Sequence, residues 1–174
     1  MVGRVTKPFN ALLGETFEVV TPTYRALAEQ VSHHPPITAI VCQGDGFSWT
    51  HTVDVKLKFT GKAIQCIEDF NYFINLYPAC KKKDTETCER YTFTPNKTHV
   101  GNLLIGDTYI EPQGISTIKN HETGEICEVD YKIRGWSGKN KEEIHGVVKN
   151  SKGEPIYHFY GKYSDKFILK NLET

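Results

Sequence analysis

The stretch with the clearest chemical potential is residues 29–36, Glu-Gln-Val-Ser-His-His-Pro-Pro, in which two adjacent histidines precede two prolines. Imidazole rings can bind metal ions, transfer protons or donate hydrogen bonds to an anion. A buried structural corner is a fourth possibility, because a proline restricts the backbone of the residue before it. The residue types at His33 and His34 leave all four interpretations open.

Both a metal site and a catalytic site lack partners in this sequence. Adjacent residues on a strand point to opposite faces, so one ion could contact His33 and His34 only if the strand ended there. The spacing of Cys80 and Cys88 is not a recognised zinc-ligand spacing. No Gly-x-Ser-x-Gly motif occurs, and Gly44-Asp45-Gly46 indicates a turn. We therefore expect no metal ion, no cofactor and no enzymatic activity.

An anion-binding pocket finds more support. The segment Lys7-Pro8-Phe9-Asn10 would supply an ammonium group and a carboxamide, with a stiff proline between them. A phosphate dianion would also favour the charged, donating form of a nearby histidine. On composition alone, however, a structural corner at His33–His34 and a solvated Lys7 remain the simpler interpretations.

The overall composition limits the class of protein. A chain of 174 residues suits one domain. Lys and Arg total 21 and Asp and Glu total 21, so the net charge is zero, which argues against nucleic-acid binding through a broad basic surface. The five cysteines are odd in number and no signal-peptide pattern occurs, which predicts reduced thiols in a cytoplasmic protein. No apolar run approaches the ~20 residues that span a bilayer, so any membrane contact should be peripheral.

The elements that must position these residues are mostly strands. From Phe47 to Phe59, apolar or aromatic residues occupy every odd position except His51, and none occupies an even position. This alternation predicts a strand with one dry face. Its length exceeds the usual five or six residues by about twofold, which favours a large curved sheet or barrel. Shorter strands are predicted at 127–133, 156–163 and 166–169, in an antiparallel meander punctuated by turns.

Two segments are harder to interpret. Tyr24–Gln30 has helix-forming composition, but it is short and lies just before the prolines, so we predict a strand. Tyr77–Asn96 contains Lys81-Lys82-Lys83 and acidic residues without clear periodicity, and we predict an exposed loop.

The motifs together resemble those of the oxysterol-binding-protein-related family of lipid-transfer proteins. The eight residues at 29–36 match its fingerprint without a gap. Residues 7–18, Lys-Pro-Phe-Asn-Ala-Leu-Leu-Gly-Glu-Thr-Phe-Glu, resemble its other signature, which usually has a proline where Ala11 stands. Weaker similarity continues through residues 91–95, 101–106, 120–124, 134–136 and 160–163.

The resemblance implies a mainly β fold, with few or no helices: a large, incompletely closed antiparallel β-barrel around a lipid tunnel. It implies that His33 and His34 contact the 4-phosphate of phosphatidylinositol 4-phosphate, and that Lys7 and Asn10 contact the rest of that headgroup. Glu15, Pro35 and Pro36 would shape the entrance. The second lipid would be a sterol or a phospholipid such as phosphatidylserine, exchanged between membranes.

The family domain is about twice as long as this chain. Residues 1–174 would therefore form a single, partial domain that lacks the N-terminal lid and the C-terminal subdomain. We expect a cytoplasmic protein that visits organelle membranes or membrane contact sites transiently. The alternative to lipid transfer is a phosphoinositide sensor or regulatory module that carries no cargo. Both histidines can reach one phosphate only if the strand ends at Ser32–His34, near Lys7 and Asn10.

Overall fold

The computed structural model describes residues 9–77, 88–104, 106–135 and 137–172, and within these ranges it contains strands and no helix. All thirteen strands belong to one sheet in which every neighbouring pair is antiparallel. The strands are β1 (Thr16–Val20), β2 (Tyr24–Ser32), β3 (Ile37–Gly44), β4 (Phe47–Phe59), β5 (Ile64–Glu68), β6 (Tyr72–Leu76), β7 (Glu89–Thr94), β8 (Lys97–Gly101), β9 (Tyr109–Asn120), β10 (Ile126–Tyr131), β11 (Glu143–Lys149), β12 (Pro155–Lys162) and β13 (Phe167–Asn171).

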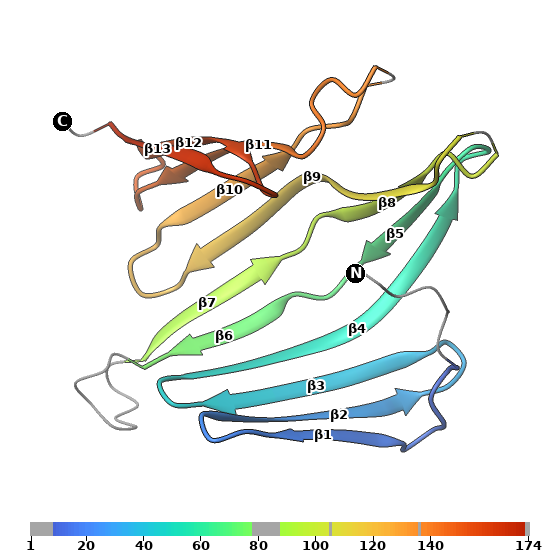
Figure 1. The fold of residues 1–174 in the computed structure, drawn as a ribbon. Helices are drawn as coiled ribbons and strands as arrows, with labels where there is room; N and C mark the ends of the chain where they lie inside the picture. The colour runs from blue at the N-terminus through green and yellow to red at the C-terminus, as the bar shows by residue number, and fades with distance from the viewer. Residues whose placement is uncertain (1–8, 78–87, 105, 136, 173–174) are drawn as a thin grey trace.

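The sheet divides between its two longest strands, β4 and β9 (Figure 1). Residues 47–50 of β4 pair with β6, whereas residues 55–59 pair with β5. In β9, residues 109–113 pair with β8 and residues 117–120 pair with β7. Two ribbons, β5–β8 and β6–β7, therefore bridge the same pair of long strands. Among the described strands β1 and β13 end the pairing path without meeting, so the barrel is incompletely closed, as predicted.

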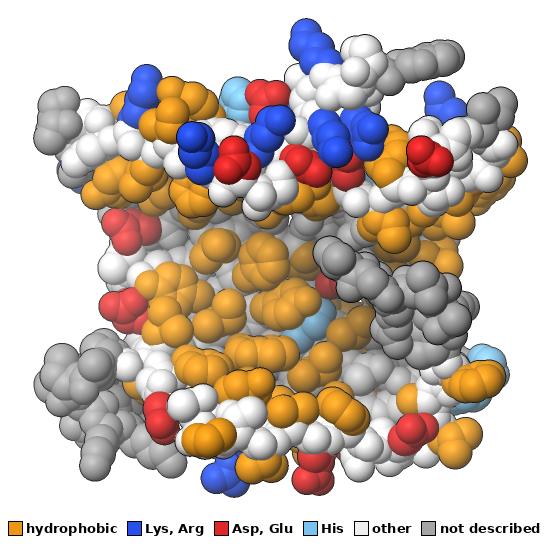
Figure 2. Space-filling model, viewed as in Figure 1, with side chains coloured by type: hydrophobic (Ala, Val, Ile, Leu, Met, Phe, Trp, Pro, Cys, Tyr) orange, Lys and Arg blue, Asp and Glu red, His pale blue; other side chains and the backbone are white. Residues whose placement is uncertain are grey.

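One face of this sheet is apolar. Cross-strand partners point to the same side, and the register joins Cys42 to Trp49, Trp49 to Ile74 and Ile74 to Tyr91. Figure 2 shows a hollow lined by hydrophobic side chains, with charged side chains gathered along its rims. The apolar face is therefore the concave wall.

This wall has no second layer over it within the described ranges. The buried apolar residues in the described ranges are few, namely Cys42, Ala63, Ile144 and Ile156, while many large apolar side chains stay exposed. A single curved sheet cannot bury both of its faces on its own. Within the described ranges the concave wall is therefore left exposed.

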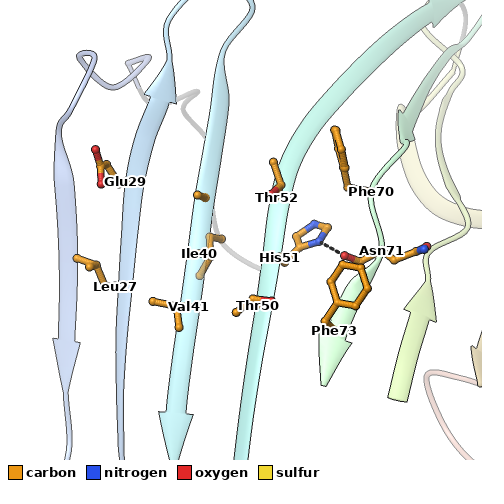
Figure 3. Close-up of a pocket in the computed structure, with 11 residues that line it drawn as sticks. Leu27, Glu29, Ile40, Val41, Thr50, His51, Thr52, Phe70, Asn71 and Phe73 are labelled. Carbon is orange, nitrogen blue, oxygen red and sulfur yellow. Dashed lines mark hydrogen bonds between the residues drawn. The ribbon is translucent and has the colours of Figure 1, made fainter. Parts of the chain in front are cut away.

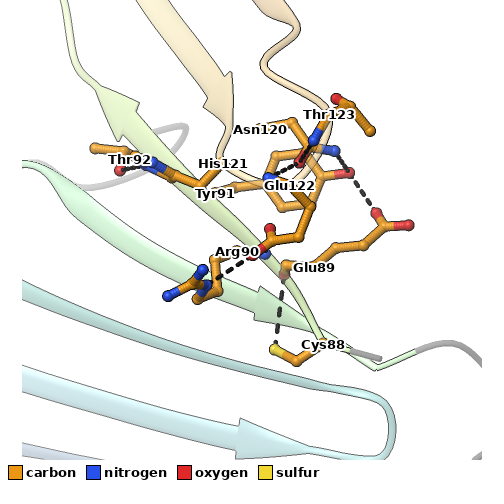
Figure 4. Close-up of polar contacts among 9 residues, drawn as sticks. All are labelled: Cys88, Glu89, Arg90, Tyr91, Thr92, Asn120, His121, Glu122 and Thr123. Atoms are coloured by element: carbon orange, nitrogen blue, oxygen red, sulfur yellow. Dashed lines mark hydrogen bonds and ion pairs between the residues drawn. The ribbon is translucent and has the colours of Figure 1, made fainter. Parts of the chain in front are cut away.

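A polar cluster holds the β7 strand to the hairpin between β9 and β10 (Figure 4). We call it the hairpin clasp, and it consists of Glu89, Arg90, Tyr91, Asn120 and Glu122. The Arg90 guanidinium donates to Glu122 at 2.7 Å, and Tyr91 donates its hydroxyl to Glu89 at 2.6 Å. Asn120 completes the cluster with a 3.0 Å bond to the Tyr91 hydroxyl. The hydrogen bond to Glu89, together with burial, raises the pKa of Tyr91 to about 12.

Most strand predictions are confirmed. The strand from Phe47 to Phe59 has the predicted bounds, and the segment beginning at Tyr24 is a strand that extends to Ser32. The three C-terminal predictions correspond to β10, β12 and β13 with small shifts at their ends. The four described cysteines are free thiols.

The predicted loop at Tyr77–Asn96 is wrong for its second half. Residues 89–94 form β7, which pairs with both β6 and β9. Its alternating Tyr91 and Phe93 continue the concave wall. The alternation of apolar and polar residues is hard to recognise in the sequence because the strand begins with two charged residues of the hairpin clasp, Glu89 and Arg90. Residues 78–87, which include the three lysines and Cys80, lie outside the described residues.

Candidate functional site

The histidine pair lies in the turn between β2 and β3. Strand β2 ends at Ser32 as predicted, after a register irregularity between Gln30 and Ser32, and residues 33–36 form the turn. The two imidazole rings meet edge to face, with 4.6 Å between ring centroids and 68° between ring planes. Leaving the extended conformation at Ser32 allows neighbouring side chains to lie together, since they no longer alternate across a sheet.

His33 is held by the loop that precedes β1. Its Nδ1 atom lies 3.0 Å from the Ala11 carbonyl oxygen and 3.3 Å from the Asn10 carboxamide nitrogen. A carbonyl can only accept, so the shorter contact places a proton on Nδ1. Nε2 is then an acceptor in the neutral ring and a donor in the imidazolium. His33 can therefore donate to a ligand through Nε2 only in its charged form.

A chain of side-chain hydrogen bonds fixes Asn10. Gln30 donates from Nε2 to the side-chain oxygen Oδ1 of Asn10 at 3.2 Å, and Thr38 donates its hydroxyl to Gln30 Oε1 at 2.7 Å. Gln30 is buried, with 4% of its surface exposed. Gln30 is the cross-strand partner of Thr38, and Thr38 is the partner of Val53, which lies on the concave face. The hydrogen bond between Thr38 and Gln30 is therefore on the concave face too. The histidine turn therefore lies at the rim of the apolar hollow.

Hydrogen bonds of Glu15 and Gly14 close the loop that precedes β1. Glu15 accepts a 2.7 Å hydrogen bond from the Leu12 backbone N–H, and the Glu15 N–H donates to the Leu12 carbonyl at 3.0 Å. The Gly14 N–H in turn donates to the Gln30 carbonyl at 2.8 Å. Pro35 and Pro36 lie exposed in the turn. Glu15 thus closes the loop that carries Asn10.

The structure thus brings together His33, His34 and Asn10, and it places Glu15, Pro35 and Pro36 around them. Lys7 lies outside the described residues. Among those residues, His34 contacts the His33 ring and has no hydrogen-bond partner. We call the group formed by His33, His34 and Asn10 the headgroup cluster.

A second histidine, His51, lies where β4 changes partner from β6 to β5. Only 1% of its side chain is exposed, and its ring stacks on Tyr72 with 3.5 Å between centroids. Its Nδ1 atom lies 3.4 Å from the Asn71 carbonyl, and its Nε2 atom lies 3.4 Å from a Glu68 carboxylate oxygen. Burial, followed by the Glu68 charge, raises the pKa of Tyr72, so its phenol stays neutral.

A pocket of about 380 Å³ opens beside His51 (Figure 3). Its apolar lining includes Leu27, Val41 and Phe73, which the register places on one face together with Thr50. That face is opposite to the concave wall, because Trp49 and His51 alternate with Thr50 along β4. The pocket is therefore separate from the rim that carries the headgroup cluster.

Sequence reasoning did not single out Gln30 and His51, although each left a signal. Gln30 follows Ala26 and Ala28 on the apolar side of β2, and His51 is the one polar residue at the odd positions of β4. A polar residue at an apolar position is expected to find a partner inside the fold. Within the described residues no group of three or more His, Cys, Asp or Glu side chains could hold a metal ion, and no helix is long and apolar enough to cross a membrane.

Comparison with known proteins identifies the family. Residues 1–174 match the family model described as "Oxysterol-binding protein". The chain belongs to the oxysterol-binding protein family. It is 37% identical over 172 residues to Oxysterol-binding protein homolog 2 of Saccharomyces cerevisiae, covering 97% of this chain and 13% of that protein. It is 34% identical over 166 residues to Oxysterol-binding protein-related protein 2 of Mus musculus, covering 93% of this chain and 33% of that protein.

Solved structures of the family share the fold. The Osh1 ORD domain in complex with ergosterol superposes with a TM-score of 0.83 at 32% identity, over 98% of this chain and 39% of that one. The Osh3 ORD of Saccharomyces cerevisiae in complex with PI(4)P superposes with a TM-score of 0.80 at 25% identity, over 95% of this chain and 42% of that one. The chain therefore spans less than half the length of each of these two relatives and two solved domains.

Proposed function

We propose that this chain is part of a non-enzymatic lipid-transfer domain that binds phosphatidylinositol 4-phosphate and exchanges it for a second lipid. The observation that carries this proposal is the position of the headgroup cluster. His33, His34 and Asn10 meet at the rim of an apolar hollow, so one ligand could place a phosphate at the cluster and its acyl chains along the wall.

The chemistry of the cluster suits a phosphomonoester. Charged imidazole rings form short, charge-assisted hydrogen bonds to phosphate oxygens. The proton on His33 Nδ1 is held by the Ala11 carbonyl, which directs the second donor of the imidazolium, at Nε2, to the ligand. Lys7, from the same signature as Asn10, would add an ammonium group. The second lipid would be a sterol or a phospholipid, supported by the ergosterol and cholesterol in the Osh1 structures.

The exchange would take place at the cytoplasmic faces of organelle membranes or at membrane contact sites, with transient peripheral attachment. Residues 1–174 would act together with the remainder of a family domain that is more than twice as long in the solved structures. A lid and a C-terminal subdomain outside these residues would cover the hollow.

One observation favours the alternative of a lipid sensor without cargo transfer. The concave wall is uncovered within the described residues, and large apolar side chains such as Phe17 and Leu169 are 69% and 59% exposed. A carrier must shield the acyl chains of its cargo from water, because exposed apolar surface is costly. Binding to phosphoinositide vesicles without release of lipid into solution would favour the sensor.

The test is transfer of phosphatidylinositol 4-phosphate between liposomes by the wild-type chain and by H33A/H34A. A matched control is H145A/H158A, which removes two exposed histidines from β11 and β12. We expect transfer or extraction to fall at least roughly 100-fold in H33A/H34A, since two charge-assisted hydrogen bonds are lost, and to be unchanged in the control. Equal activity of H33A/H34A and wild type would refute the site.

A further inference from the structure

The loop that carries Asn10 also carries a cluster of exposed apolar side chains. Phe9 is 102% exposed, Leu12 is 71% exposed and Leu13 is 68% exposed. We call these three residues the apolar lip. Single exposed apolar residues are ordinary on protein surfaces, but contiguous ones mark an interaction site.

Part of the backbone of the loop that carries the lip is already hydrogen-bonded within the chain itself. The Leu12 N–H donates to the Glu15 carboxylate and the Leu12 carbonyl accepts from the Glu15 N–H, while the Gly14 N–H donates to β2. Transfer of a backbone N–H or C=O group without a hydrogen-bond partner from water into an apolar medium is unfavourable by several kcal/mol, so such groups must be paired first. This closed turn presents two leucines at its tip and can leave water without breaking these hydrogen bonds.

The lip and the headgroup cluster are parts of one unit. Asn10 and Ala11, which contact the His33 ring, lie in sequence between Phe9 and Leu12. The Gly14 N–H bond to Gln30 holds the far side of the loop against the same strand end. Any partner that meets the lip therefore lies beside the histidine pair. Such a partner combines an apolar layer with a phosphate at its edge, which is the chemistry of a bilayer surface.

We propose that Phe9, Leu12 and Leu13 insert into the interfacial region of the bilayer and hold the headgroup cluster at the depth of the lipid phosphates. This inference rests on the proposed function, because the His33–His34 turn is taken to receive the headgroup. The lip supplies affinity for the membrane irrespective of headgroup, and the cluster supplies selectivity for the phosphomonoester. Burial of apolar side chains at the interface strengthens membrane binding in proportion to the apolar area that is buried.

The experiment compares L12A/L13A with H33A/H34A in two assays. The first is calorimetric binding of a water-soluble, short-chain phosphatidylinositol 4-phosphate, which needs no membrane. The second is co-sedimentation at high salt with phosphatidylcholine vesicles, with and without phosphatidylinositol 4-phosphate. The control is I168A/L169A on β13, whose side chains are 52% and 59% exposed. All the substituted apolar side chains are exposed, so these variants should fold, and circular dichroism checks this.

We expect L12A/L13A to bind the soluble lipid like wild type and to lose roughly 10- to 100-fold in vesicle affinity on both compositions. The control should bind vesicles like wild type. Vesicle binding by L12A/L13A at wild-type strength would overturn the inference, as would a dimer, detected by ultracentrifugation, that dissociates only in L12A/L13A. Failure of wild type to bind the soluble lipid would instead overturn the headgroup assignment, while loss of phosphatidylcholine binding in L12A/L13A would still support insertion.

Discussion

The His33–His34 turn and His51 use the same side chain in opposite surroundings. His33 is half-buried and held only through Nδ1, and His34 is exposed. His51 has 1% of its side chain exposed, stacks on Tyr72, and has Nδ1 within 3.4 Å of the Asn71 carbonyl oxygen and Nε2 within 3.4 Å of Glu68. The exposed ring of His34 is open to solvent, whereas almost none of the His51 ring is. The difference indicates that binding depends on which ring atoms the fold leaves accessible, not on the residue type.

The largest effect should come from His51→Ala. Removing this ring leaves a cavity against Tyr72 and breaks the contact with Asn71, and we expect unfolding free energy to fall by about 2–4 kcal/mol. H33A/H34A should lose less, about 1 kcal/mol, because His34 is exposed and His33 is only half-buried. Urea denaturation of both variants measures the contrast. Equal destabilisation of the two variants would contradict the proposed difference between His51 and the His33–His34 turn.

An intermediate effect on the free energy of unfolding is expected for Gln30→Ala, because Gln30 links the headgroup cluster to the sheet. The change leaves the Thr38 hydroxyl and the Asn10 carboxamide without their partner, which costs about 1–3 kcal/mol. We also expect headgroup affinity to drop about tenfold, because Asn10 loses its fixed position. The control is Gln43→Ala, an exposed glutamine on β3. Unchanged affinity in Gln30→Ala would show that the cluster does not depend on the sheet for its geometry.

The smallest effect concerns the hairpin clasp, a polar cluster whose partners are all supplied by the chain. The backbone N–H of Arg90, and then its guanidinium, donate to Glu122 and lower the pKa of that carboxyl. A lowered folded-state pKa gives stability that is fully present above the unfolded value of ~4.3 and is lost as pH falls through the folded value. We expect Glu122→Gln to lower Tm by about 1–2 °C at neutral pH, and the difference to vanish in acid.

The matched control for that measurement is Glu18→Gln, since Glu18 is exposed on β1 and has no partner among the described residues. It should leave Tm unchanged across the same pH range. A Tm difference for Glu122→Gln that persists below the folded-state pKa would mean that the clasp acts through packing and not through charge.

How far the fold follows from sequence differs along the chain. The bounds of β4 were predictable because one wet and one dry face produce strict alternation from Phe47 to Phe59. Strand β7 was missed because the hairpin clasp places Glu89 and Arg90 at its start, and Glu122, the partner of Arg90, lies about thirty positions away in sequence. The division of the sheet between β4 and β9 was not predicted, since pairing between distant strands leaves no local pattern.

In the candidate site, too, contacts between segments distant in sequence could not be predicted. The turn at His33 was predictable because the family resemblance implies that both histidines contact one phosphate, which neighbouring residues can do only if the strand ends before them. The chain of bonds from Thr38 through Gln30 to Asn10 was not, because it joins three segments that meet only in the folded sheet. The apolar lip was visible in the sequence as Phe9, Leu12 and Leu13, but its exposure became apparent only in the structure.

The most direct test of the histidine assignment compares two lipids, with and without the 4-phosphate, and two proteins, with and without His33 and His34. Wild type and H33A/H34A are incubated with vesicles that contain equal amounts of phosphatidylinositol and phosphatidylinositol 4-phosphate, and the extracted lipids are quantified by mass spectrometry. We predict that wild type prefers the phosphorylated lipid by roughly 100-fold and that H33A/H34A has no preference. A preference of wild-type size in H33A/H34A would contradict the assignment of His33 and His34 to the phosphate.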